Sequence, residues 1–197
     1  MIPADSQQPP EPGVPSRPNL PVGDPRVTSV SHTVFTPVGP ISVTSTDEAI
    51  VRVEWRSLSA SGPSAADCSD DATTGLLAEA IAQLRAYFDG TLHEFDLPVS
   101  LDGVSPVARS VLTTLHRTIE YGTTVTYGEL AVRNGQGVPA RAIGGIMGSN
   151  PLPILIPCHR VVASTGLGGY SGGERGRGLE TKRWLLEFEG GLPRGLF

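Results

Sequence analysis

The 197-residue sequence is poor in cysteine, with only Cys68 and Cys158. Two cysteines are too few for a disulfide framework or for a zinc cluster built on cysteine. Three histidines, His32, His93 and His116, have no partners at metal-ligand spacing, so we predict no metal and no cofactor. In a reducing compartment both cysteines would be free thiols, either buried as small apolar groups or kept as nucleophiles.

Long apolar runs are also missing. No stretch reaches the roughly 18 apolar residues of a membrane span, and the N-terminus lacks the basic-then-apolar pattern of a secretory signal. Apolar residues make up 39% of the chain, a value typical of globular proteins, and the length allows one or two small domains. We therefore expect a soluble protein of the cytoplasm, without a membrane partner.

Lysine is nearly absent, because Lys182 is the only one beside 14 arginines, which favours a GC-rich bacterial source. The net charge of −5 argues against a nucleic-acid partner, but the charge is unevenly distributed. Residues 1–102 hold 5 arginines and 14 acidic residues, whereas residues 103–197 hold 10 basic and 6 acidic residues. A nucleic-acid partner would therefore bind the second half, unless the asymmetry is chance drift.

The first 30 residues predict a disordered, proline-rich tail. Eight of the 18 prolines and no aromatic residue lie in residues 1–25, so this stretch cannot bury enough apolar surface to offset the entropy of ordering it. The tail is interpreted as a passive extension, with binding to a partner domain as the alternative.

Residues 31–102 predict a small α/β domain. Apolar stretches on both sides of Pro37–Pro40 indicate a hairpin, and alternation over 51–55 indicates a third, half-buried strand. Residues 57–74 are small and polar and predict a loop. From Gly75 to Phe88, apolar residues spaced by four, three and four residues predict a helix with one buried stripe. That stripe consists of Leu77, Ile81, Leu84 and Phe88.

Residues 103–197 predict a mainly helical domain. After a connector over 92–104, a helix is expected over 107–119, and Thr126 is a candidate N-cap for a short helix over 127–133. A glycine-containing turn leads to another helix from Pro139 to Met147, and the pair suggests a helix-turn-helix. The chain then predicts a last helix, Leu179 to Glu189, whose core face is formed by Trp184, Leu185 and Phe188.

The helix that begins near Pro139 is almost bare. Alanines and glycines surround a single long side chain, Arg141. Such a helix can approach another surface closely, which is either DNA or another part of this protein.

Cys158 lies in the tetrad Pro157-Cys158-His159-Arg160, after Ile154–Ile156, which predicts a short buried strand. Positive neighbours lower the pKa of a cysteine and favour the reactive thiolate. From these residues alone, Cys158 is either a reactive thiol or a buried structural one.

Four segments resemble the O6-alkylguanine-DNA alkyltransferases, the methylated-DNA–protein-cysteine methyltransferases. They are Arg141–Gly145, Asn150-Pro151, Ile154–Val162 and Gly169–Gly173. The resemblance covers about residues 32–190 and is strongest from Tyr121 onward. The first half matches only in its element order and in the segment Leu84–Gly90. The resemblance implies an α+β protein, with an N-terminal ribonuclease H-like α/β domain and a winged-helix-like domain for DNA binding and catalysis.

The resemblance also implies residue roles for single-turnover transfer of an alkyl group to the protein. Cys158 would be the nucleophile, His159 the base that takes its proton through a water, and Glu189 the carboxylate that orients His159. Asn150 would brace the turn around the site. Without the resemblance, Glu189 would be interpreted as a solvated helix-end residue.

For DNA, the resemblance implies a monomer that binds the minor groove of alkylated double-stranded DNA. Tyr127 would rotate the damaged nucleotide outward and Arg141 would fill its place. Further DNA contacts are implied at Gly128, Gln136, Ala108 and Ser164. The flipped base would lie under Tyr170, and its pocket would be completed by Ser171, Val161 and Lys182. The loop Gly166–Gly178, with seven glycines in 13 residues, would close over it. O4-alkylthymine is a further candidate substrate.

The sequence departs from the family at three points. Val107-Ala108 stands where members often have an aromatic residue followed by Thr or Gln, which puts one phosphate contact in doubt. Thr113 replaces a common tryptophan and should change core packing. The cysteines of the structural zinc site found in some members are missing.

Three other classes of function fit the sequence less well. A lesion sensor of the alkyltransferase-like type would lack the cysteine that is present here. A cysteine hydrolase would need a histidine that faces the thiol from elsewhere in the fold, whereas His159 is its sequence neighbour. A plain helix-turn-helix DNA binder should carry several base-reading side chains, and this one offers only Arg141.

Overall fold

The computed structural model describes residues 29–56 and 75–192. The predicted tail up to residue 28, the predicted loop over 57–74 and Cys68 lie outside the described residues. Among the described residues, no helix is long and apolar enough to cross a membrane.

The N-terminal part is an antiparallel sheet of three strands. Strands β1 (Val30–Thr36), β2 (Gly39–Ser45) and β3 (Ile50–Trp55) are hydrogen-bonded in the order β1-β2-β3. Thr36 pairs with Gly39 across the first turn, so the predicted hairpin and third strand are confirmed. The connector adds one more contact, a parallel bridge between Ile50 and Val99.

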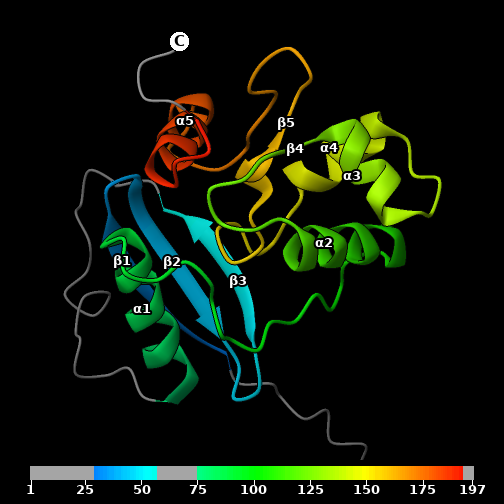
Figure 1. The fold of residues 1–197 in the computed structure, drawn as a ribbon. Helices are drawn as coiled ribbons and strands as arrows, with labels where there is room; N and C mark the ends of the chain where they lie inside the picture. The colour runs from blue at the N-terminus through cyan, green and yellow to red at the C-terminus, as the bar shows by residue number, and fades with distance from the viewer. Residues whose placement is uncertain (1–28, 57–74, 193–197) are drawn as a thin grey trace, which may run out of the picture.

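Helix α1 (Gly75–Phe88) lies along the sheet (Figure 1). The predicted stripe is confirmed for Leu77, Ile81 and Leu84. Its last member differs, because Tyr87 is fully buried whereas Phe88 is only partly buried.

Three helices form the next part of the chain, and they group on the opposite side of the molecule from α1 (Figure 1). They are α2 (Pro106–Thr118), α3 (Tyr127–Asn134) and α4 (Ala140–Gly148). Thr126 caps α3 as predicted, because its hydroxyl accepts from the Glu129 amide while the Glu129 carboxylate accepts from the Thr126 amide. Gly135, in the left-handed conformation with a φ of 68°, ends the helix.

The segment that leads to Cys158 contains an error of the sequence prediction. Residues Ile154–Ile156 are buried but form a turn and not a strand. Ile154 has a φ of 74°, a conformation that is strained for a β-branched residue. A short 3-10 helix, η3 (Cys158–Arg160), follows, and β5 (Val161–Val162) then pairs in parallel with β4 (Val125–Thr126).

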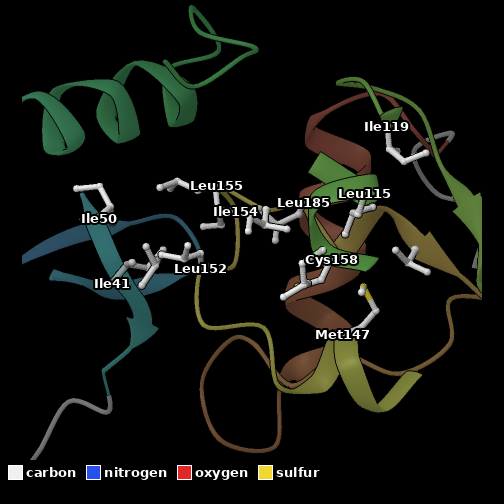
Figure 2. Close-up of a cluster of buried hydrophobic side chains, with 14 of the residues drawn as sticks. Ile41, Ile50, Leu115, Ile119, Met147, Leu152, Ile154, Leu155, Cys158 and Leu185 are labelled. Atoms are coloured by element: carbon white, nitrogen blue, oxygen red, sulfur yellow. The ribbon is translucent and has the colours of Figure 1, made fainter. Parts of the chain in front are cut away.

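The last helix, α5 (Gly178–Phe188), closes the fold. One continuous hydrophobic core joins the two halves of the molecule, and Figure 2 shows part of it. Ile41 and Ile50 of the sheet approach Leu152 and Leu155, and this row continues toward Leu185, Leu115 and Cys158. The sheet domain is therefore packed directly against the segment that carries the cysteine.

Candidate active site

Cys158 is held at the end of a tightly hydrogen-bonded turn. The Asn150 side chain accepts from the Leu152 amide at 3.0 Å and donates to the Ile156 carbonyl at 2.8 Å. The Cys158 amide then donates to the same carbonyl of Ile156 at 2.8 Å. Asn150 therefore lies where it can brace the turn, and these bonds hold Ile154 in its strained conformation.

The thiol lies at a cavity of about 520 Å³. This volume is in the range of small-molecule sites, which hold about 300–1,000 Å³. The cavity is bordered by α3, α4 and the glycine-rich loop. Its lining residues are Tyr127, Ala140, Arg141, Gly144, Met147, Gly148, Cys158, Gly169, Tyr170 and Ser171.

Burial raises the pKa of the Cys158 thiol, although the side chain of Asn150 and the charge of Lys182 oppose this effect. Burial therefore outweighs the lowering of the pKa that the positive neighbours in the sequence favour, so the resting group is the thiol. The reason is geometric, because the Arg160 guanidinium binds Glu189 and the Ile119 carbonyl. The cation that acts on the thiol is Lys182, from α5.

Glu189 is the centre of a buried polar network behind the cysteine. Its carboxylate accepts from Arg160 Nε at 2.8 Å and Nη2 at 3.0 Å, and from His159 Nε2 at 2.9 Å. Burial alone would raise the pKa of Glu189, but the bonds and charges of His159 and Arg160 bring it down to about 2. Glu189 is thus ionised at neutral pH.

The network also fixes the protonation of His159. Burial lowers the pKa of His159 more than the Glu189 carboxylate raises it, so the imidazole is neutral at pH 7. Because an ionised carboxylate can only accept, Nε2 carries the hydrogen. Nδ1 is then a bare acceptor, and it is buried without a hydrogen-bond partner. His159 can therefore take up one proton.

Lys182 is fully buried and its ammonium group donates to two carbonyls. Nζ lies 2.6 Å from the Val161 oxygen and 3.0 Å from the Gly169 oxygen. Burial lowers the pKa of Lys182 to about 8, so the group remains largely charged at pH 7. The Val161 carbonyl is thus already in use, but a carbonyl oxygen has a second lone pair for another donor.

The glycine-rich loop brings Tyr170 and Ser171 to the cavity. The Tyr170 hydroxyl is buried without a hydrogen-bond partner, and burial raises its pKa well above the usual range. Ser171 Oγ donates to the Gly148 carbonyl at 3.0 Å. Glycine is needed at 172, because a Cβ there would lie 2.6 Å from the Tyr170 ring and 2.7 Å from that of Trp55.

The residues expected to touch DNA differ in their exposure. Arg141, Gly128, Gln136 and Ser164 are exposed, and Tyr127 is half-buried with its hydroxyl 3.4 Å from the Gly169 carbonyl. Ala108 differs from them, because its side chain is buried and its amide donates to the cap residue Ser105. Neither group of Ala108 is free to contact DNA.

The position of Thr113, where a tryptophan was expected, is half-buried. It lines a hollow of about 640 Å³ between α2 and α3, together with Thr114 and Arg133. Val107, which stands where family members often have an aromatic residue, is 49% exposed. Within the described residues, no three histidine, cysteine or acidic side chains form a metal site.

Two residues of the N-terminal part reach the site and were not predicted. The Tyr87 hydroxyl donates to Glu189 at 2.7 Å, and the Trp55 ring meets that of Tyr170 edge-on, with centroids 6.0 Å apart. One signal for Tyr87 is present in the sequence, because Tyr87 follows Leu84 at the helical spacing of three.

Comparison with protein families accounts for both halves of the chain. Residues 30–101 match the family described as 6-O-methylguanine DNA methyltransferase, ribonuclease-like domain. Residues 106–191 match the DNA binding domain of the same protein family.

Individual relatives agree. The methylated-DNA–protein-cysteine methyltransferase of Metallosphaera sedula is 38% identical over 163 residues, which cover 81% of this chain and 92% of that protein. The Mycobacterium tuberculosis protein of the same name is 37% identical over 159 residues, 80% of this chain and 90% of the relative.

Solved structures show the same likeness. The crystal structure of the M. tuberculosis O6-methylguanine methyltransferase has a TM-score of 0.66 and 34% identity, over 86% of this chain and 98% of that one. The structure of the M. tuberculosis protein in complex with DNA has a TM-score of 0.66. The match covers 81% of this chain and 92% of that one.

Proposed function

The chain belongs to the 6-O-methylguanine DNA methyltransferase family, and we propose that Cys158 takes the alkyl group from O6 of guanine in double-stranded DNA. One observation carries this assignment to residues. Cys158 borders a cavity between the helix-turn-helix and the Tyr170 loop, next to a neutral histidine with an unpartnered nitrogen. The reaction is direct-reversal DNA repair.

The proposed DNA surface is the exposed edge of α3 and α4. Arg141 would enter the base stack while Tyr127 displaces the nucleotide, at a cost of a few kcal/mol that is lower for a poorly paired lesion. Small residues on α4 would let its backbone approach the minor groove, whose degenerate hydrogen-bond pattern suits a protein that scans any sequence. Gly128, Gln136 and Ser164 would contribute further contacts.

In the cavity, the flipped guanine would stack under Tyr170. The Ser171 amide would lie near O6, and the carbonyls of Cys158 and Val161 would accept hydrogen bonds from the amino group. A water would pass the thiol proton of Cys158 to Nδ1 of His159. Because the charged thiolate is disfavoured by burial, it would form only when this transfer and Lys182 stabilise it.

The chemical step is an in-line displacement. Sulfur bonds to the alkyl carbon as the bond from carbon to O6 breaks, and the electron pair leaves with guanine. The guanine then takes a proton at N1, so the net change moves one alkyl group to sulfur and one proton to the base. Tyr170 or Lys182 would neutralise the developing negative charge. Nothing in the site can hydrolyse a thioether, so each molecule would act once.

We further propose that the protein acts as a monomer on the nucleoid, in the cytoplasm, where its DNA substrate lies. The buried Cys158 and the exposed Arg141 belong to the same chain, so the proposed site needs no second copy.

The test is to mix the protein with excess duplex DNA that carries radiolabelled O6-methylguanine. We expect the label on the protein to reach a plateau near one methyl group per molecule, and Cys158→Ala to give none. Cys158→Ala should still bind the lesion, which separates loss of transfer from loss of binding. Tight binding without transfer in the native protein would contradict the proposal and indicate a lesion sensor, whereas continued turnover would contradict the suicidal mechanism.

A further inference from the structure

Tyr87 connects the N-terminal domain to the carboxylate behind the nucleophile. It lies on α1 and its hydroxyl donates to Glu189 Oε1 at 2.7 Å, across 102 residues of sequence. The side chain is fully buried. Burial and the nearby carboxylate raise the pKa of Tyr87 well above its usual range, so the hydroxyl keeps its hydrogen and is a permanent donor.

The oxygen that Tyr87 binds is the one that holds His159. Glu189 Oε1 accepts from Tyr87 at 2.7 Å, from His159 Nε2 at 2.9 Å and from Arg160 Nη2 at 3.0 Å. Three donors thus share one oxygen. Each donor withdraws electron density from the carboxylate and weakens its attraction for the proton of the other two.

The Tyr87 ring is held in a fixed position by aromatic neighbours on four segments of the chain. Its centroid lies 5.0 Å from that of Phe88, 5.4 Å from Phe95, 6.2 Å from Tyr121 and 5.7 Å from Phe188. A ring packed in this way gives the hydroxyl one direction, toward Glu189. The aromatic neighbours therefore hold the Tyr87 side chain in one conformation, in which its hydroxyl meets Glu189.

We propose that Tyr87 is a positioning residue for alkyl transfer, which acts through Glu189 to keep His159 neutral and oriented. This inference rests on the proposed function of His159 as the proton acceptor. It gives the N-terminal domain a role in the chemistry, although that domain contributes no side chain to the cavity at Cys158.

The direction of the effect follows from the charges that face His159. Glu189 favours the imidazolium, whereas Arg160 and Lys182 disfavour it, and burial disfavours it most. Loss of the Tyr87 hydroxyl would leave the carboxylate a stronger acceptor, so the balance would move toward the imidazolium. An imidazolium cannot accept the thiol proton, so transfer would slow at the acidic side of the pH range.

The experiment compares the native protein with Tyr87→Phe, which keeps the ring and removes the donor. Single-turnover methyl transfer from excess O6-methylguanine duplex is measured from pH 5.5 to 8. We expect the acidic limb of the rate profile to move upward by roughly half a pH unit to one unit, the worth of one hydrogen bond. On that limb the rate should fall about threefold to tenfold below that of the native protein, and near pH 8 the two rates should be equal.

Phe88→Leu is the matched control, because it loosens the same aromatic cluster without removing a donor to Glu189. We expect it to lower the unfolding temperature and to leave the pH profile in place. A Tyr87→Phe protein that is only less stable, with an unmoved profile, would overturn the proposal and leave Tyr87 as a packing residue.

A second measurement does not depend on transfer. In protein with ¹⁵N-labelled histidine, the His159 resonance, assigned with His159→Gln, should titrate at a higher pH in Tyr87→Phe than in the native protein. Native protein that transfers no methyl group would refute the proposed function, yet this titration would still decide the influence of Tyr87 on His159. An unchanged titration would overturn it.

Discussion

The two halves of the molecule differ in what they bury. Among the described residues of 30–101, the buried side chains are almost all apolar, and the buried polar ones are His32, Ser42 and Ser45. In residues 106–191 the buried set includes two cations and a carboxylate. Those charged groups, with their polar neighbours, are Arg160, Lys182, Glu189, His159 and Thr181.

The first half of the molecule therefore mainly stabilises the fold, whereas the second half holds the charged groups of the candidate site. Burying apolar surface stabilises a fold by roughly 25 cal/mol per Å², whereas burying a charge costs several kcal/mol unless it is well paired. The second half therefore gives up stability to hold Lys182 and Glu189 near the thiol. The shared core that runs from the sheet to Cys158 offsets this loss (Figure 2).

Removal of a core side chain from the N-terminal part should change stability strongly and leave the chemistry unchanged. Leu77 of α1 is 3% exposed and does not line the cavity, so Leu77→Ala should lower the free energy of unfolding by about 2–5 kcal/mol. The rate of transfer per folded molecule should not change. Thermal unfolding and single-turnover kinetics at a temperature where the variant is folded measure the two quantities.

Leu179→Ala is the control for that substitution, because Leu179 is 53% exposed on α5. Its stability should stay within about 0.5 kcal/mol of the native value. A slower rate in the folded Leu77→Ala protein would show that the N-terminal core does more than stabilise.

In the second half of the molecule, a substitution at Lys182 should affect the rate of transfer and the stability of the fold differently. Lys182→Met should slow transfer about a hundredfold, because in the proposed reaction it removes the charge that would stabilise the thiolate and the leaving guanine. Its effect on the free energy of unfolding should be small, because two changes oppose each other. The cost of a buried ammonium, whose pKa burial lowers to about 8, is removed, but the Val161 and Gly169 carbonyls lose their donor.

The same group predicts a pH dependence. The cost of charging buried Lys182 is fully present below pH 8 and disappears as pH rises through about 8 toward its ordinary value of 10.5. Lys182 loses its charge as pH rises through about 8, so transfer by the native protein should decline over this range. Lys182→Met should lack this decline. Arg117→Met, at an exposed cation of α2, should keep it. A decline that persists in Lys182→Met would assign the limb to another group.

Local signals in the sequence were enough to predict most helices and strands. The Thr126 cap, the spacing along α1 and the proline-containing turn before β2 each act within a few residues, and the structure contains all three. The turn at Ile154 was not predictable in this way. A short apolar run fits a buried strand as well as a buried turn, and the Asn150 side chain braces the turn by donating to the Ile156 carbonyl and accepting from the Leu152 amide.

The candidate site shows the same limit. Sequence adjacency placed Arg160 beside Cys158, but adjacency does not give the direction of a side chain, and the guanidinium points to Glu189. Tyr87 and Trp55 lie on other elements, far along the chain from the residues that they contact. Such contacts arise only when the two halves pack together, so no local pattern reports them.

A substitution at Trp55 should have the smallest effect, and it tests whether the N-terminal part also acts on the site. Trp55 ends β3 in the N-terminal part, donates to the Val38 carbonyl at 3.0 Å and meets the Tyr170 ring edge-on at an interplanar angle of 82°. If Tyr170 covers the flipped base, Trp55→Phe should loosen that cover. An edge-to-face pair is worth about 0.5–1.5 kcal/mol, so we expect the DNA concentration at half-maximal rate to rise about threefold.

The maximal rate in Trp55→Phe should be unchanged, because Trp55 does not line the cavity at Cys158. Trp184→Phe is the control, because Trp184 is the other tryptophan of the chain and stacks on Phe188 at 4.9 Å. It should change neither quantity. A lower maximal rate in Trp55→Phe would mean that the sheet also sets the geometry of the thiol, through the bond from the Val53 amide to the Pro151 carbonyl. No change at all would mean that the glycine-rich loop holds Tyr170 without help, and the N-terminal half would then act on the site through Tyr87 alone.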